Sequence, residues 1–286
     1  MVNHLGNWRN GELGNFITLK RGFDLPQQKR EDGQVPIFSS SGITGTHSTA
    51  MVNAPGVITG RYGTIGEVFY AAEDFWPLNT TLFVEDFHGN DAEFIYYFLK
   101  TLEWSKFTSA SAVPGINRNT VHKETVSLPD IETQRRIAST LSMLDEKIKT
   151  NTEINDNLYA QAKAIFDNHF INIDAIPAGW RKGNLLDIAN YLNGLAMQKF
   201  RPQGNEIGLP VLKIKELRQG SCDDSSELCS LRIKPEYIIH DGDVIFSWSG
   251  SLLVDIWCGG TCGLNQHLFK VTSDIYDKWF YYLWTA

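Results

Sequence analysis

The chain has 286 residues, which is more than one average domain needs and suits two. Its composition, with 42% hydrophobic and 21% charged residues, is globular, and it has no signal-peptide pattern and no apolar run of roughly 18–20 residues. The formal net charge of −7 excludes DNA binding through overall positive charge, so any such binding requires local basic loops or partners. We expect a soluble cytoplasmic protein without membrane association.

Residues 1–129 are expected to form a strand-rich module. Runs such as 56–59 are short, β-branched and bounded by breaking residues, which is typical of strands, and Gly63 and Gly66 mark tight turns. Residues 91–104 carry closely spaced aromatic and leucine side chains without a breaker. This spacing favours a helix buried on a broad face, although the pattern alone also fits a strand. The module is therefore predicted to be α+β.

Residues 130–172 are predicted to form one long helix. Asp130 is placed to cap it, and neither Pro nor Gly occurs from there to His169. Apolar side chains recur at steps of four and three, as in a coiled-coil seam: Ile137, Leu141, Leu144, Ile148 and Leu158. Asn151 and Asn155 interrupt this seam at core positions, where polar side chains tend to fix register and partner.

A helix of this length, roughly 55–60 Å, cannot bury an apolar stripe by itself. One interpretation is a helix that packs on its own domains. The position between two repeated modules favours a spacer, whose seam residues serve subunit assembly.

Residues 173–286 repeat the order of the first module. Trp8-Arg9 and Trp180-Arg181 begin the two copies. Further pairs follow in order: Gly22 and Gly194, Val35-Pro36-Ile37 and Leu209-Pro210-Val211, Val57-Ile58 and Val244-Ile245, Asn79 and Asn265, Tyr96-Tyr97 and Tyr281-Tyr282. The second copy stops at Ala286, soon after Tyr282, so we expect a second domain that is truncated at its C-terminus.

The segment around the start of the helix resembles a known family. Its matching runs are Leu128-Pro129, Gln134-Arg135-Arg136-Ile137-Ala138 and Leu144-Asp145-Glu146-Lys147-Ile148. They resemble the spacer-helix motif of Type I restriction-modification specificity subunits, and the resemblance extends over nearly the whole chain. Supporting runs in the modules are Gly60-Arg61-Tyr62-Gly63-Thr64-Ile65-Gly66, Gly115-Ile116-Asn117-Arg118-Asn119 and Asn265-Gln266-His267-Leu268-Phe269.

The resemblance implies an α+β protein with two repeated, strand-rich target recognition domains, 1–129 and 173–286, joined by a long coiled-coil spacer helix, 130–172. Each domain would read one half of a split target in double-stranded DNA. The implied partners are modification subunits, which are adenine methyltransferases, and restriction subunits, which are motor nucleases. Self-association through the spacer helix is a further expectation. The implied role is host defence coupled to DNA methylation.

Catalytic chemistry is not expected in this chain. The sequence has no Asn/Asp-Pro-Pro-aromatic motif for amino-group methylation and no G-x-x-x-x-G-K-[ST] phosphate loop. Asp145-Glu146-Lys147 has a nuclease-like form but lies on the predicted helix, where an exposed charged face is the better interpretation. The four cysteines are irregularly spaced, which favours small buried side chains over zinc ligands. We therefore expect no catalytic residue, no metal and no cofactor.

Candidate DNA contacts are side chains that reach base edges or phosphates from turns. Arginine or lysine pairs with guanine, asparagine or glutamine pairs with adenine, and phosphate contacts give position without sequence. The first domain offers Lys20, Arg21, Ser41, His47, Arg61, Tyr62, Asn117 and Arg118. The second domain offers Lys213, Lys215, Ser249, Asn265, Gln266 and His267. At each position a turn residue or a structural hydrogen bond is the competing interpretation.

Two other functional classes remain open at this point. One is a scaffold or inhibitor that does not bind DNA and acts through its long helix, which the negative net charge favours mildly. The other is an autonomous enzyme, against which the missing motifs argue. Neighbouring genes for a methyltransferase and a helicase-like nuclease would separate these classes from a specificity subunit.

Overall fold

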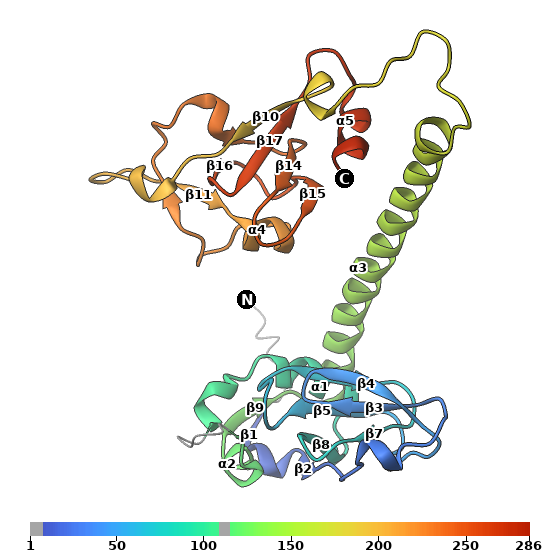
Figure 1. The fold of residues 1–286 in the computed structure, drawn as a ribbon. Helices are drawn as coiled ribbons and strands as arrows, with labels where there is room; N and C mark the ends of the chain where they lie inside the picture. The colour runs from blue at the N-terminus through green and yellow to red at the C-terminus, as the bar shows by residue number, and fades with distance from the viewer. Residues whose placement is uncertain (1–7, 109–114) are drawn as a thin grey trace. The chain divides into compact units, whose positions relative to one another are not determined.

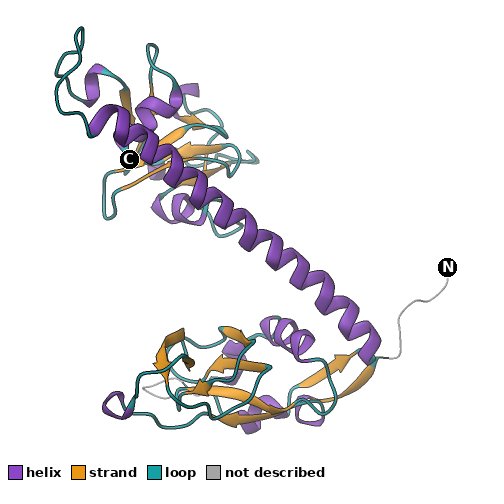
Figure 2. Cartoon of the chain, turned by 90° about the vertical axis from the view of Figure 1, so that its right-hand side faces the viewer, coloured by secondary structure: helices purple, strands orange, loops and turns teal. Residues whose placement is uncertain are grey.

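The chain forms two compact units, Met1–Ile154 and Asn155–Ala286 (Figure 1). The structure is a computed structural model that describes residues 8–108 and 115–286. Each unit is an assembly of short strands with a few helices, and a long helix contributes residues to both (Figure 2).

The first unit contains a four-stranded antiparallel sheet in the order β2-β8-β5-β6. Its strands are β2 (Thr18–Arg21), β8 (Thr81–Asp86), β5 (Gly56–Gly60) and β6 (Val68–Ala71). A three-stranded sheet has the order β4-β3-β7, built from β4 (Gly42–His47), β3 (Val35–Ser39) and β7 (Trp76–Pro77), with β3 and β7 parallel. Further elements of the described part are the pair β1 (Arg9–Glu12) and β9 (Thr125–Leu128), and the helices α1 (Ala92–Lys100) and α2 (Arg118–His122). Short 3₁₀ helices cover Leu13–Asn15, Gln27–Lys29 and Trp104–Phe107.

The second unit has the same plan. Its four-stranded antiparallel sheet, in the order β10-β17-β14-β15, consists of β10 (Asn190–Asn193), β17 (Leu268–Thr272), β14 (Val244–Ser247) and β15 (Leu253–Ile256). The other sheet has the order β12-β11-β16-β13, with β12 (Leu228–Cys229), β11 (Leu209–Leu212), β16 (Cys262–Leu264) and β13 (Ile238–Ile239). Strands β11 and β16 are parallel, as β3 and β7 are. Two helices complete the unit, α4 (Ile214–Gln219) and α5 (Lys278–Thr285).

These matching sheet orders confirm the α+β fold class with two repeated, strand-rich modules. Gly22 and Gly194, which occupy the same place in the two copies, are required for the same structural reason. A Cβ on Gly22 would lie 2.1 Å from the Leu78 carbonyl oxygen, and a Cβ on Gly194 would lie 2.2 Å from the Asn265 carbonyl oxygen. Only glycine permits that approach of two backbones.

The strand pairing corrects one detail of the sequence repeat. Phe23 forms a parallel bridge with Leu78, and Leu195 forms the equivalent bridge with Asn265. Asn265 therefore corresponds in space to Leu78, and Asn79 corresponds to Gln266. The two asparagines aligned in the sequence are displaced by one residue, so Asn265 lies at the bridge whereas Asn79 lies in the turn that follows it.

Helix α3 (Ile131–Phe166) has 36 residues and continues into a π-helical turn over Asp167–Ile171. Its first turn is capped as expected, because the Asp130 Oδ1 accepts a hydrogen bond of 2.9 Å from the Thr133 amide. That bond also holds the pKa of Asp130 below its ordinary value. In the described ranges no helix, α3 included, is both long and apolar enough to cross a membrane.

A buried amide attaches the start of α3 to the first unit. Gln134 is fully buried, and its Nε2 donates to Asn90 Oδ1 at 2.8 Å and to the Pro129 carbonyl at 2.9 Å. Its Oε1 accepts from the Asp91 amide at 2.9 Å. The neighbouring Ala138 is buried in the core of the first unit, against which Ile137 packs. The Gln134 amide is therefore fully satisfied inside this joint, as a buried polar group requires.

The end of α3 is held by aromatic side chains of the second unit. Phe166 is buried, with its ring centroid 6.2 Å from that of Phe280 and 5.2 Å from that of Trp284. Phe170 stacks on Trp180 at 5.5 Å. The second Trp-Arg pair thus contributes its tryptophan to the packing of this cluster.

Candidate nucleic-acid interface

A pocket of about 460 Å³ in the second unit gathers most of the residues predicted there to contact DNA. It is lined by Met197, Gln198, Arg201, Lys213, Ile214, Lys215, Glu227, Asn265, Gln266 and His267. These residues come from four separate segments, so only the fold places them together. Three of the lining side chains are cations and one is a carboxylate.

Carboxylates hold the cations of this pocket in place. Glu227 accepts from Lys213 Nζ and from Arg201 Nη2, the latter at 2.5 Å. Hydrogen bonds from Lys213 and then Arg201 keep the pKa of Glu227 below its usual value. All three side chains are substantially exposed, so the pairs are open to water and to competing anions.

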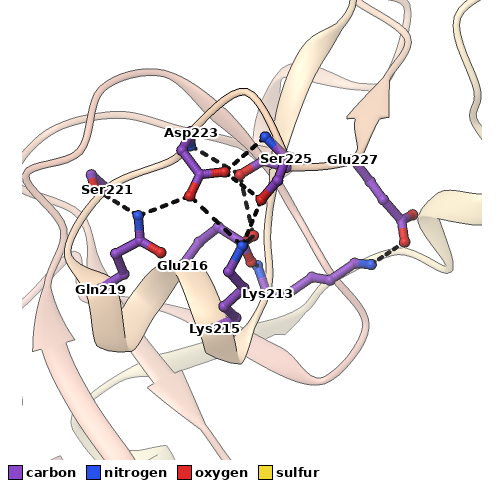
Figure 3. A network of polar contacts seen from close by, with 9 residues as sticks. Lys213, Lys215, Glu216, Gln219, Ser221, Asp223, Ser225 and Glu227 are labelled. Carbon is purple, nitrogen blue, oxygen red and sulfur yellow. Dashed lines mark hydrogen bonds and ion pairs between the residues drawn. The ribbon is translucent and has the colours of Figure 1, made fainter. Parts of the chain in front are cut away.

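Lys215 belongs to a second polar group, which includes Asp223 and Ser225 (Figure 3). Its Nζ donates to Ser225 Oγ at 2.8 Å and lies 3.7 Å from Asp223 Oδ2. Hydrogen bonds from Ser225 and Gln219 hold the pKa of Asp223 well below its ordinary value. The three pocket cations are thus oriented by neighbouring side chains, and each retains exposed surface.

The loop between β16 and β17 forms another wall of the pocket. Asn265 is buried, and its Oδ1 accepts from the His267 amide at 3.2 Å, so it shapes the loop. Gln266 is half-buried and His267 is exposed, which leaves both able to meet a ligand. Ser249 lies half-buried in the turn between β14 and β15.

In the first unit, Arg61 and Tyr62 follow β5 at the equivalent turn. The Arg61 guanidinium carbon lies 4.5 Å from the Tyr62 ring centroid, and its Nε donates to the Ile116 carbonyl at 3.3 Å. The Ile116 amide donates in return to the Arg61 carbonyl at 3.0 Å. This exchange brings Asn117 and Arg118 close to the turn.

Asn117 and Arg118 begin helix α2 and remain exposed. The Asn117 Oδ1 accepts from the Asn119 amide at 3.0 Å, so the side chain also caps the helix. Arg118 Nη1 donates to the Leu19 carbonyl at 3.4 Å. Leu19 directly precedes Lys20 and Arg21, the two residues predicted to contact phosphate. Lys20 is paired with Glu85, and Arg21 is 3.5 Å from Asp24, so both cations have carboxylate neighbours.

The polar loop after β3 divides into two parts. Ser41 is exposed at the β3–β4 turn, with its Oγ 3.0 Å from that of Ser39. His47 is instead buried, its Nδ1 accepts from the Glu31 amide at 3.0 Å, and its ring packs edge-on against Trp76. The structure therefore corrects the expectation for His47, because a buried ring engaged by the backbone cannot reach DNA.

Sequence reasoning missed four residues at these surfaces: Gln198, Arg201, Glu227 and Trp248. Arg201 and Glu227 are far apart in sequence and meet only through the salt bridge at the pocket. Trp248 is exposed and directly precedes Ser249, so its place in the turn was a usable signal. Gln198 offered no distinguishing pattern.

The apolar seam of α3 is partly covered near the first unit and exposed farther along the helix. Ile137 and Leu141 are half-buried beside the first unit, whereas Leu144, Ile148 and Leu158 are exposed. Met143, Ile154 and Ile165 add further exposed apolar surface to the helix. Such a stripe on a helix is typical of a surface that pairs with another helix.

Neither metal binding nor thiol chemistry is indicated in the described ranges. Within residues 8–108 and 115–286, no group of three or more His, Cys, Asp or Glu side chains could hold a metal ion. Burial raises the pKa of the Cys222, Cys229 and Cys262 thiols, which keeps them protonated.

Comparison with known proteins gives a consistent result. Residues 6–160 match the family described as Type I restriction modification DNA specificity domain. The MjaIX specificity subunit of Methanocaldococcus jannaschii is 25% identical over 187 residues, which are 58% of this chain and 43% of that protein. The HindI specificity subunit of Haemophilus influenzae is 34% identical over 92 residues, 30% of this chain and 20% of that protein. The matched segments thus span less than half the length of either relative.

A solved structure shares the fold. The crystal structure of a Type I restriction-modification S subunit from M. genitalium has a TM-score of 0.61 and 16% identity. The similarity covers 100% of this chain and 78% of the other. At that identity the match is evidence for the fold alone.

Proposed function

Because the chain belongs to the family of Type I restriction-modification DNA specificity domains, we propose that it selects the DNA sequence for a Type I restriction-modification complex. The observation that carries this proposal is the pair of equivalent modules. Each presents turn side chains of the types that read base edges, and the second places them beside three cations.

Each module reads one half of a split target in this proposal. Helix α3 sets the gap between the halves. Its 36 residues span about 54 Å, which at about 3.4 Å per base pair limits the gap to about 16 base pairs. The part of α3 that packs on the modules shortens the usable length further.

The charges of the chain make its DNA binding local and sensitive to salt. With a net charge of −7 the chain as a whole repels phosphate, so attraction depends on local sites such as the one with Arg201, Lys213 and Lys215. Their carboxylate partners compete with phosphate for the same cations. Specific contacts to bases then contribute a large share of the discrimination between sequences.

Catalysis belongs to partners in this proposal. The chain offers no catalytic motif, and it binds adenine-methylating modification subunits and motor-nuclease restriction subunits. The exposed apolar residues of α3 supply an assembly surface, and pairing with the same helix of a second copy is the simplest way to cover it.

Methyl transfer to DNA tests the proposal. The purified chain with S-adenosylmethionine should transfer no methyl group to DNA, and adding modification subunits should produce sequence-specific adenine methylation. Cleavage should require restriction subunits and ATP in addition. Methyl transfer by the chain alone would refute the proposal. Failure of the assembled complex to bind DNA would favour a scaffold or inhibitor instead.

A further inference from the structure

The turn between β14 and β15 exposes a large aromatic side chain. Trp248 is 46% exposed, and Leu252 at the other end of the same turn is 79% exposed. A tryptophan in such a position usually buries its ring against a partner, because exposure of its large apolar surface to water is unfavourable. The side chains next to this turn therefore indicate which kind of partner would cover Trp248.

Two contacts place the turn at the rim of the basic pocket. The Trp248 ring centroid lies 6.1 Å from that of His267, which lines the pocket. A Cβ on Gly250 would lie 3.9 Å from Ile214 Cδ1, another lining atom. The pocket at whose rim Trp248 lies also contains the cations Lys213 and Lys215, which suit a polyanion.

The turn is held in one shape by its own polar groups. Ser247 is buried, and its Oγ donates to the Ser249 carbonyl at 3.4 Å. The Ser251 amide donates to the same carbonyl at 2.9 Å, and Arg218 donates to Ser251 Oγ. The left-handed φ of 75° at Gly250 completes the turn. Trp248 is therefore presented by an ordered segment.

The first unit has a charged residue at the equivalent position. Gly63 has a φ of 76°, matching Gly250, and the strand pairing of β5 with β8 and of β14 with β17 places Arg61 where Trp248 stands. The following residues differ as well, with Tyr62 in one unit and Ser249 in the other. The same position in the fold is thus occupied by a cationic side chain in the first unit and by an aromatic side chain in the second.

We propose that Trp248 contacts bases and determines sequence preference in the half-site read by the second unit, at the position that Arg61 occupies in the first. This inference rests on the proposed function. The indole is apolar on both faces and has a single N–H donor, so it suits a thymine methyl group or an unstacked base face. Arg61 instead suits the acceptor edge of guanine.

A selection from randomised double-stranded DNA tests this inference. The full chain, assembled with its modification subunits, is incubated with the library, and bound sequences are compared for the wild type and variants. Trp248→Ala should lose the preference at one or two adjacent base pairs of one half-site. Its affinity for the wild-type motif should fall about 10- to 100-fold.

Two further variants keep the result interpretable. Trp248→Arg should acquire a guanine preference at the affected position, which a merely structural tryptophan would not produce. Ile207→Ala removes an apolar side chain of the same unit that is even more exposed, at 85%, and does not line the pocket, so it should leave the motif and the affinity unchanged.

The possible failures are distinguishable. An unchanged motif in both Trp248→Ala and Trp248→Arg, with a wild-type complex that selects a clear motif, overturns the role of Trp248 alone. A folded Trp248→Arg complex that loses every base preference equally also overturns it, since the residue would then act on the whole unit. A wild-type complex that enriches no motif overturns the proposed function itself.

Discussion

At the scale of single residues, Gln134 explains why the start of the spacer motif contains an amide. Its side chain makes three hydrogen bonds in a fully buried joint, and two of them involve the Asn90-Asp91 segment that precedes α1. A charged or apolar side chain of similar size cannot replace all three, because the joint requires both a donor and an acceptor.

We predict that Gln134→Leu lowers the free energy of unfolding of the first unit by about 1–3 kcal/mol, because it leaves buried polar groups unpaired. Chemical denaturation followed by circular dichroism measures the change. Arg135→Gln, on an exposed neighbouring position, is the control and should stay within about 0.5 kcal/mol of the wild type. If Gln134→Leu and the control have equal free energies of unfolding, the hydrogen bonds of Gln134 contribute nothing to the stability of the first unit.

His122 gives the first unit a dependence on pH. Its Nε2 accepts a hydrogen bond of 2.9 Å from the Leu19 amide, which requires the neutral ring. Burial, and then the nearby Arg118, lower the pKa of His122 below its ordinary value of 6.5. Below about pH 6.5 the unfolded chain therefore binds a proton that the folded chain resists.

We predict that the stabilising contribution of His122 is complete above pH 6.5 and falls as the pH drops toward the lowered pKa. The free energy of unfolding should be compared between pH 8 and pH 5.5 for the wild type and His122→Gln. The glutamine can accept the same bond without titrating, so its curve should be flatter. If the free energies of unfolding of the two proteins change with pH in parallel, a group other than His122 causes the pH dependence.

At the scale of elements, the apolar seam of α3 is half-buried at its start and exposed from Leu144 onward. The Tyr97 hydroxyl donates to Asp145 Oδ2 at 2.8 Å, and burial, followed by that carboxylate, raises the pKa of the tyrosine. Beyond this contact Ile148, Asn151 and Asn155 continue the seam with exposed side chains. The exposed part of the seam is therefore available for assembly without a cost to the fold of the chain.

We predict that Leu144→Asp combined with Ile148→Asp abolishes assembly through α3 while the first unit stays folded, because unpaired charges in a buried seam are costly. Light scattering measures the self-association of the chain, and co-purification measures the binding of modification subunits. Thr150→Asp adds a charge on the other face of the helix and should leave both intact. Unchanged assembly of the double variant would remove the seam from the interface.

At the scale of the whole molecule, the helix length and the target gap should change together. Deleting 151–157 removes one heptad but keeps Leu144 and Ile148, and it shortens α3 by about 10 Å while the seam stays nearly in register. We predict a gap shorter by about three base pairs with both half-sites unchanged. Methylome sequencing of cells that carry the chain and its modification subunit measures the gap.

A deletion of five residues, 151–155, is the contrasting variant. It rotates the remaining helix by about 140° relative to the seam, so we expect assembly to fail even though the change in length is smaller. Methylation at the original gap by the heptad deletion would show that α3 does not set the spacing.

The sequence alone determined the features that depend on local patterns. The repeat, the α+β class, the single long helix and its cap at Asp130 follow from periodicity, turn residues and capping chemistry. These features involve residues that are close in the chain, so a contiguous stretch contains all the information they need. The predicted domain limits at 129 and 172 stay predictions.

Only the tertiary structure decided which side chains meet. Arg201, Lys213 and Glu227 form one charged site because β11 and β12 pair, and no local pattern relates their positions. Whether His47 is buried was equally invisible in the sequence, because a polar loop has the same composition whether a ring turns inward or outward. The one-residue displacement between Asn79 and Asn265 needed the strand bridges, since register is set by pairing across the sheet and a sequence alignment does not contain it.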